Sequence, residues 1–306
     1  MELARMLTGA SAAHLLALSR MSSIMDHRRA FRPRHTQRML RVVAYREAPR
    51  VRPTNTEWAR GLSTDALSVV FQPIVDLSDG RVFAHEALVR CKDPRYPTPP
   101  RLFEAAIEEG ACGWLGRSIR DIAFRTCGDN RLFVNLHPQE LTSRWLVKPD
   151  DPIGFHDQQV YLEITEVSAF EQFDLCMGVL KELCRRTGAF LVVDDFGAGY
   201  SNLERVADLA PAVVKLDMAL TRDIHNRKAR QIIVRHVVGM CTELGAVVVG
   251  EGVETLDELK CLRDLGVGYA QGYLLARPGA PPPEHHWPLA TPASSGAMKA
   301  KPPPRR

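Results

Sequence analysis

The stretch FLVVDDFGAGY, residues 190–200, determines how the rest of the chain is interpreted. Its first four residues are apolar and mostly β-favouring, which predicts a buried strand of a parallel sheet. Asp194 and Asp195 follow at the carboxyl end of that strand, and Gly197 and Gly199 allow a sharp turn beside them. Because neighbouring residues on a strand point to opposite faces, two adjacent acids can address two points, as a pair of cations requires. A solvated Asp-Asp turn explains this stretch equally well, so the other strands must decide.

On both sides of this stretch, short apolar segments alternate with amphipathic ones. The chain opens with two β-rich segments, 67–75 and 81–89, joined by a tight turn at Asp79 and Gly80. The later segments with strand character are 132–136, 160–164, 190–193, 212–216, 246–249 and 268–270. Helical periodicity is present in 102–109, 114–127, 171–187, 202–209, 228–244 and 256–265. The alternation predicts an α/β fold, a (β/α)8 TIM-like barrel in which the opening hairpin makes one strand antiparallel.

Nearly every predicted strand ends in an acid or an amide. These residues are Glu86, Asn135, Glu166, Asp194, Asp195, Glu251 and Gln271, and Lys215 lies within the strand at 212–216. In a barrel the carboxyl ends of the strands converge on one rim, where barrel enzymes have their sites. Converging carboxylates repel one another unless cations neutralise them, and hard oxygen ligands favour Mg²⁺ or Mn²⁺ over zinc. The pattern therefore predicts a two-metal centre.

Charge divides the 306 residues into three parts. Residues 1–60 have twelve arginines against four acids, a net charge of +8. Residues 61–278 have 24 basic against 31 acidic residues, a net charge of −7, and residues 279–306 are Pro-rich and basic. This predicts a central domain over 61–278, flanked by flexible basic arms at 1–60 and 279–306, of which the first has a possible short helix. An acidic centre is not typical of a specific nucleic-acid-binding domain.

The seven cysteines are scattered and form no C-x-x-C pair, which is typical of buried thiols in a reducing compartment. No apolar run reaches the length of a transmembrane helix, and residues 10–18 are too short and broken to resemble a secretion signal. We therefore expect a cytoplasmic protein. The Arg-rich arm at 1–60 attracts anionic surfaces, which predicts a weak contact with membranes; a solvated arm is the alternative.

In order along the chain, seven short motifs resemble those of the EAL-domain cyclic-di-GMP phosphodiesterases. They are Glu86-Ala87-Leu88 with Arg90, Val134-Asn135-Leu136, Ile164-Thr165-Glu166, Asp194–Ser201, Lys215-Leu216-Asp217, Glu251–Thr255 and Gln271-Gly272-Tyr273. The resemblance extends from about 67 to 278. It implies hydrolysis of cyclic di-GMP to linear pGpG with two Mg²⁺ or Mn²⁺ ions.

The resemblance also implies a role for each matching residue. One metal would be held by Glu86, Asn135, Glu166 and Asp194, and the second by Asp194, Asp195 and Glu251. Lys215 matches the catalytic lysine, and Asp195 and Glu251 are catalytic as well as ligands. Gln72, Arg90 and Gln271 match substrate-binding positions. A structural ion pair is the alternative for Lys215, and a surface position is the alternative for Arg90.

Two functions remain to be compared. The first is the hydrolase, and the alternative is a non-catalytic cyclic-di-GMP receptor or protein-interaction module on the same fold. Degenerate family members normally lose a metal ligand or the lysine, whereas every such residue is present here, which favours the hydrolase. The family also implies a homodimer, formed near the loop 196–201 and the helix that follows it.

Overall fold

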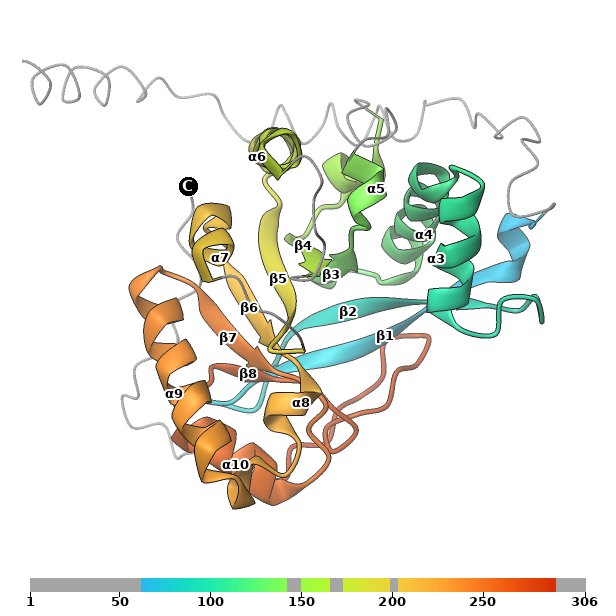
Figure 1. Cartoon of the computed structure of the whole chain (residues 1–306). Coiled ribbons are helices and arrows are strands. Elements are labelled where there is room, and N and C mark those ends of the chain that lie inside the picture. The colour runs from blue at the N-terminus through green and yellow to red at the C-terminus, as the bar shows by residue number, and fades with distance from the viewer. Residues whose placement is uncertain (1–61, 142–149, 166–172, 199–202, 290–306) are drawn as a thin grey trace, which may run out of the picture. The chain divides into compact units, whose positions relative to one another are not determined.

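The computed structural model describes residues 62–141, 150–165, 173–198 and 203–289. Eight strands form a closed barrel in which each strand pairs with its neighbour in sequence and β8 pairs with β1 (Figure 1). The strands are β1 (Leu67–Asp76), β2 (Val82–Cys91), β3 (Leu132–Asn135), β4 (Val160–Thr165), β5 (Phe190–Phe196), β6 (Val213–Leu216), β7 (Val247–Gly250) and β8 (Tyr269–Ala270).

The hairpin at the start of the domain gives the barrel its one antiparallel strand, β1. β1 runs antiparallel to both β2 and β8, and every other neighbouring pair is parallel. The turn between β1 and β2 contains Gly80 with a positive φ of 74°, a conformation that glycine adopts at little cost. The predicted (β/α)8-type barrel with one antiparallel strand is confirmed.

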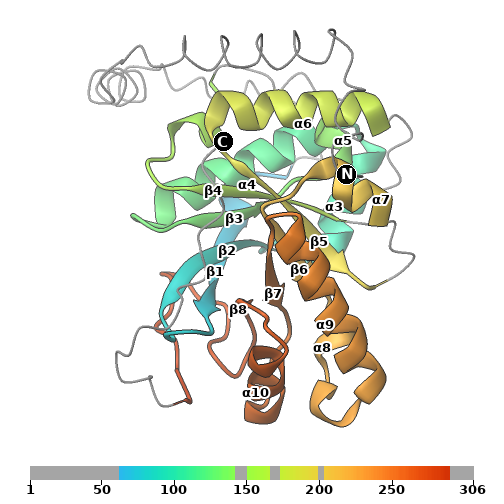
Figure 2. The same cartoon turned by 90° about the vertical axis from the view of Figure 1, so that its left-hand side faces the viewer.

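Helices follow one another around the outside of the strands (Figures 1 and 2). They are α3 (Pro99–Glu108), α4 (Cys112–Thr126), α5 (Pro138–Leu141), α6 (Phe173–Thr187), α7 (Leu203–Leu209), α8 (Met218–Thr221), α9 (Lys228–Glu243) and α10 (Leu256–Asp264). Three short 3₁₀ helices are η1 (Thr64–Ala66), η2 (Pro152–Phe155) and η3 (Ile224–Asn226). None of the helices in the described ranges has both the length and the apolar character to cross a membrane.

One buried layer of side chains fills the barrel interior. Each strand contributes one residue to it: Ile74, Ala84, Phe133, Tyr161, Val192, Val213, Val249 and Tyr269. The rings of Phe133 and Tyr161 stack with their centroids 4.4 Å apart. The alternate strand residues, such as Val134 and Leu162, belong to a larger cluster that also includes helix residues. Because side chains alternate along a strand, the residue two positions from each member of this layer also faces the barrel interior.

The segment after residue 278 differs from the sequence expectation. We expected a flexible tail from Gly279, but residues up to 289 are described and contact the barrel. The backbone of Gly279 exchanges two hydrogen bonds with Phe71, at 2.7 and 2.9 Å. The Trp287 ring lies against Gly80, where a Cβ atom would be 2.6 Å from it. The partly buried Trp287 ring also packs against the main apolar cluster, which holds this segment on the barrel. The arm at 1–60 lies outside the described residues.

Candidate active site

A ring of polar residues lies directly above the interior layer, at the carboxyl ends of the parallel strands. Each member is two residues beyond an interior-layer residue, or two before it in the antiparallel β1. The ring consists of Gln72, Glu86, Asn135, Glu163, Asp194, Lys215, Glu251 and Gln271. The period of two along a strand places all eight side chains on the inner face. The closed sheet thus converts positions spread over 200 residues into one cluster.

The ammonium of Lys215 lies at the centre of this ring. Its Nζ atom is 2.6 Å from Glu163 Oε1 and 2.6 Å from Glu251 Oε1. Asp194 Oδ1 lies 3.1 Å from the same nitrogen, and Glu86 Oε2 lies 3.5 Å from it. Lys215 itself is 1% exposed. Burial alone lowers the pKa of this lysine, but the four carboxylates outweigh burial and raise the pKa well above its ordinary value.

Amide side chains connect the remaining members of the ring. Asn135 Nδ2 donates to Glu163 Oε2 at 3.0 Å and to Glu86 Oε1 at 3.4 Å. Gln271 Nε2 donates to Glu86 Oε2 at 2.6 Å and to Gln72 Oε1 at 3.0 Å. These bonds hold the Glu86 carboxylate between β3 and β8 and fix its orientation.

One ammonium cannot balance so many buried carboxylates. Burial, followed by the charge of Glu86, raises the pKa of Glu163 well above its ordinary value. Burial is also the main cause that raises the pKa of Glu251, to about 8. For Asp195, burial and then the charge of Asp194 raise the pKa. The ring is short of positive charge, which is the electrostatic condition for binding cations.

The two adjacent acids of β5 both reach the cluster, although strict alternation would separate them. Asp195 has a positive φ of 57°, and the pairing of β5 with β6 shifts register between Val193 and Phe196. As a result, one carboxylate oxygen each of Asp194, Asp195 and Glu251 lies within 4.8 Å of the others. We expected two separate points on opposite faces; the irregular backbone instead turns Asp195 toward its neighbour.

The residues present fit a pair of hard divalent cations. The ring offers carboxylate oxygens from β2, β4, β5 and the end of β7, together with the amide oxygen of Asn135. Apart from the Lys215 ammonium, no donor in the described part of the chain faces Glu163 Oε1 or Asp194 Oδ1. Oxygen donors of this kind suit Mg²⁺, Mn²⁺ or Ca²⁺ better than zinc.

Glu163 is the one member of this ring that we did not expect from the sequence. The glutamate expected at this strand end, Glu166, lies outside the described residues. Glu163 is 1% exposed and contacts both Lys215 and Asn135. Strict period-two counting from the apolar strand 160–164 would have found it, because Tyr161 and Glu163 share the inner face of β4.

Of the expected substrate-binding residues, Gln72 and Gln271 are members of the ring, and Arg90 lies outside it. Gln72 is 8% exposed and donates from Nε2 to the Ala276 carbonyl at 3.0 Å. Arg90 lies on the same face of β2 as Glu86, four residues further along the strand, and its side chain is exposed. Its guanidinium donates to the Val89 carbonyl at 2.8 Å.

The chain is similar to a family of known proteins. A model described as "EAL domain" matches residues 55–278. Cyclic di-GMP phosphodiesterase PdeR of Escherichia coli K12 is 32% identical over 237 residues, which cover 73% of this chain and 36% of PdeR. Cyclic di-GMP phosphodiesterase RocR of Pseudomonas aeruginosa is 31% identical over 248 residues, which cover 77% of this chain and 62% of RocR.

A solved structure, the manganese and cyclic di-GMP complex of Klebsiella pneumoniae BlrP1 at pH 6, is 34% identical with a TM-score of 0.63. The alignment covers 73% of this chain and 58% of that one. This chain spans about a third of the length of several curated relatives, 31%, 35% and 36% in three of them.

Proposed function

From the fact that this chain belongs to the EAL domain family, we infer that it hydrolyses cyclic di-GMP to linear pGpG with the help of two Mg²⁺ or Mn²⁺ ions. The observation that carries the proposal is the polar ring, in which carboxylates surround one buried lysine at the carboxyl ends of the strands. The names of PdeR and RocR support the substrate, and the manganese complex of BlrP1 supports a divalent cation.

We assign the ring residues to two cation positions. Glu86, Asn135, Glu163 and Asp194 would hold the first, and Asp194, Asp195 and Glu251 would hold the second, so that Asp194 would belong to both sets. Glu166, the expected ligand of the first cation, is replaced in this assignment by Glu163 because Glu163 contacts Asn135 and Lys215. When bound, two such cations polarise a phosphoryl group and lower the pKa of a water molecule.

The chain's own groups position the substrate and stabilise charge. The Lys215 ammonium offsets negative charge that develops on the phosphoryl oxygens during attack. Asp195 and Glu251 accept hydrogen bonds from the attacking water and orient it. The Arg90 guanidinium presents parallel N–H donors that match a phosphate, and Gln72 and Gln271 line the same edge of the ring.

Incubation of the full chain with cyclic di-GMP and Mg²⁺, followed by chromatography of the nucleotides, tests this function. We expect linear pGpG to accumulate, and no product when a chelator is in excess. Binding of cyclic di-GMP without any product would instead establish the alternative, a receptor on the same fold. Full activity in excess chelator would contradict the role of the cations.

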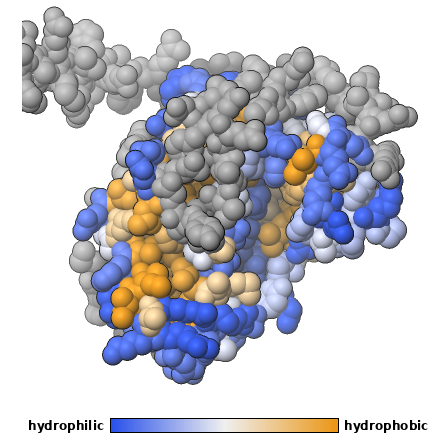
Figure 3. Space-filling view, viewed as in Figure 1, coloured by the Kyte–Doolittle hydropathy of each residue, from blue (hydrophilic) through white to orange (hydrophobic). Residues whose placement is uncertain are grey.

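We further propose that two copies of the chain associate. The helix α7, next to the expected contact loop, has Leu203 at 53% exposure. On α9, Ile232 and Ile233 are 46% and 47% exposed, and Figure 3 shows apolar surface on the side where α9 lies. Exposed apolar side chains on helices such as α7 and α9 are typical of a surface that contacts a second copy of the same chain. Light scattering that gives the mass of a fully active monomer would contradict the dimer.

The cytoplasmic location and the membrane contact of the arm at 1–60 also remain proposals from the sequence. The arm predicts sedimentation with anionic vesicles at low salt, and the attraction should weaken as salt screens it. Removal of residues 1–57 should abolish sedimentation and leave hydrolysis within about tenfold of the full chain. Equal sedimentation of both chains would exclude the arm as the membrane contact.

A further inference from the structure

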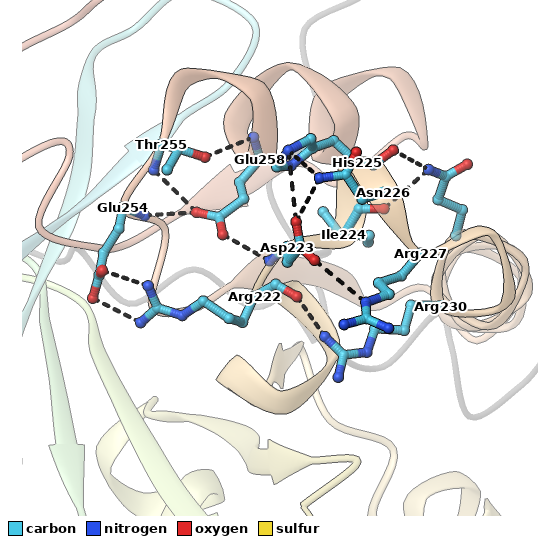
Figure 4. Close-up of polar contacts among 11 residues, drawn as sticks. Arg222, Asp223, Ile224, His225, Asn226, Arg227, Arg230, Glu254, Thr255 and Glu258 are labelled. Carbon is cyan, nitrogen blue, oxygen red and sulfur yellow. Dashed lines mark hydrogen bonds and ion pairs between the residues drawn. The ribbon is translucent and has the colours of Figure 1, made fainter.

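The carboxylate of Glu258, in the first turn of α10, joins two loops that are distant in sequence (Figure 4). Its side chain is 2% exposed. Oε1 accepts the backbone N–H of Asp223 at 2.8 Å, and Oε2 accepts the N–H groups of Glu254 at 2.9 Å and Thr255 at 3.0 Å. Burial raises the pKa of Glu258, but these three N–H groups outweigh burial and hold the pKa below its ordinary value. The carboxylate is therefore ionised, and both of its oxygens accept hydrogen bonds.

Both loops begin at members of the polar ring. The first follows β6 and Lys215 and includes α8, Asp223 and η3. The second follows β7 and includes Glu251, Glu254 and Thr255. The two loops also meet directly, because the Thr221 hydroxyl of α8 donates to the Glu251 carbonyl. The Glu251 N–H donates to the carbonyl of Leu216, the last residue of β6, at 3.2 Å. The backbone of Glu251 is thus held by β6 at its N–H and by the loop after β6 at its carbonyl.

The loop after α8 is held by contacts of both its backbone and its side chains. Asp223 has a positive φ of 55°, a conformation that aspartate tolerates better than most residues with a side chain. Its carboxylate accepts from Asn226 Nδ2 at 2.7 Å, and Arg222 forms a two-pronged ion pair with Glu254 across the gap between the loops. Arg222 and Asp223 are half-buried and Asn226 and Glu254 are exposed, whereas the side chain of Glu258, which joins the two loops, is buried.

Helix capping explains only part of this arrangement. A capping box requires that Thr255 Oγ1 accept from the Glu258 N–H and that Glu258 accept from the Thr255 N–H, and both bonds are present. The bond to Asp223 is not part of the cap. It uses the second carboxylate oxygen, and it reaches a residue 35 positions earlier in the chain.

We propose that Glu258 is a positioning residue for Glu251: it locks the loop after β7 to the loop after β6 and thereby sets the place of the Glu251 carboxylate in the ring. This inference rests on the proposed function for its kinetic consequence, but not for its consequence on cation binding. Removal of a group that orients a metal ligand without touching the metal typically lowers metal affinity or activity by about 10–100-fold.

Glu258→Ala, Glu258→Gln and Leu259→Ala in the full chain test the proposal. Leu259 is the matched control, since it is fully buried on the same helix and its apolar side chain cannot hydrogen-bond either loop. Two measurements are made well below the melting temperature of every variant. One is Mn²⁺ binding, followed by the electron paramagnetic resonance signal of the free ion, and the other is kcat and KM for cyclic di-GMP.

Glu258→Ala should lower the Mn²⁺ affinity of the cation position that includes Glu251, and should lower kcat, each by about 10–100-fold. KM should change less than about threefold. Glu258→Gln should lie between Glu258→Ala and the natural chain, because an amide retains one acceptor oxygen and replaces the other by a donor. Leu259→Ala should lower the melting temperature and leave both readouts within about threefold.

Equal Mn²⁺ binding and kcat in Glu258→Ala and Leu259→Ala would overturn the positioning role. If the natural chain binds Mn²⁺ but makes no product, the proposed function fails, and the Mn²⁺ titration still decides the role of Glu258. If kcat and Mn²⁺ affinity fall together in all three variants, α10 stability and not Glu258 controls the site, which also contradicts the proposal.

Discussion

Glu163 shows how much the position of a single side chain within a strand matters. It lies inside β4, between Leu162 and Ile164, which belong to the larger apolar cluster that includes helix residues. Its carboxylate faces Lys215 and Asn135. Glu166 follows the end of β4 at Thr165. Because β4 ends before Glu166, counting by twos from Tyr161 along the strand selects Glu163 for the inner face.

Replacement of each glutamate by glutamine separates the two assignments. Glu163→Gln should lower kcat on the order of 100-fold or more and weaken Mn²⁺ binding, since loss of a ligand should exceed the usual outer-shell effect. Glu166→Gln should have the smaller effect on Mn²⁺ binding. Kinetics together with Mn²⁺ titration of both variants measure this, and a reversed order would restore Glu166 as the ligand.

The sequence was sufficient for most of the ring and insufficient for specific parts of it. Gln72, Glu86, Asn135, Asp194, Lys215, Glu251 and Gln271 could be named because the strand ends follow from apolar periodicity and from motif order. Glu163 was missed because the motif Ile164-Thr165-Glu166 directed attention to its last residue, Glu166, and not to the residue that precedes the motif. The direction of Asp195 depends on a register shift, and the contact of Trp287 with Gly80 joins residues far apart in sequence, so neither follows from local propensity.

At the scale of elements, a buried ion-pair cluster fastens α4 to α5 and η2. Arg120 of α4 donates to Glu140 at 2.7 Å and to Asp151 at 3.0 Å, and all three side chains are at most 3% exposed. Glu140 also accepts the backbone N–H of His137 at 3.0 Å, close to the ring residue Asn135. Burial raises the pKa of Glu140 in spite of the arginine. The cluster therefore supports the loop that follows β3.

Removal of the buried arginine should destabilise the barrel strongly. Arg120→Ala leaves two carboxylates buried without their cation and should cost about 3–5 kcal/mol in the free energy of unfolding. A loss of this size lowers the melting temperature on the order of 10 °C in a domain of this length.

Arg125 of the same helix provides the control. It pairs with Asp121 at 2.6 Å, and both side chains are exposed. Arg125→Ala should therefore change the free energy of unfolding by only about 0.3–0.5 kcal/mol. Urea unfolding of both variants measures the difference, and similar losses would mean that the buried cluster does not fasten these elements.

At the scale of the whole molecule, the polar ring couples stability to pH. The ordinary pKa of a glutamic acid is 4.5, and that of Glu251 in the fold is about 8. Between these values the folded state binds more protons than the unfolded state. The stabilising contribution of this group is therefore complete below about pH 4.5 and is lost as pH rises toward about 8. Glu163 acts in the same direction.

The metal-free protein should consequently lose melting temperature as pH rises from about 5 to about 8, and Glu251→Gln should reduce that slope. Saturating Mg²⁺ should abolish the slope, because cations hold the carboxylates in the ionised form and protons are released on binding. Calorimetry at several pH values measures both effects. A metal-free slope of the opposite sign, unchanged in Glu251→Gln, would show that the ring does not dominate the linkage.

We propose that the ring formed by all eight strands would hold two divalent cations, with Asp194 beside both. Anomalous diffraction at the manganese edge, from crystals of the chain grown with Mn²⁺, tests it most directly. We predict two peaks about 3.5–4 Å apart, both beside Asp194, one next to Glu163 and the other next to Asp195 and Glu251. A single peak, or two peaks that do not share Asp194, in crystals of a chain that hydrolyses cyclic di-GMP would contradict the account.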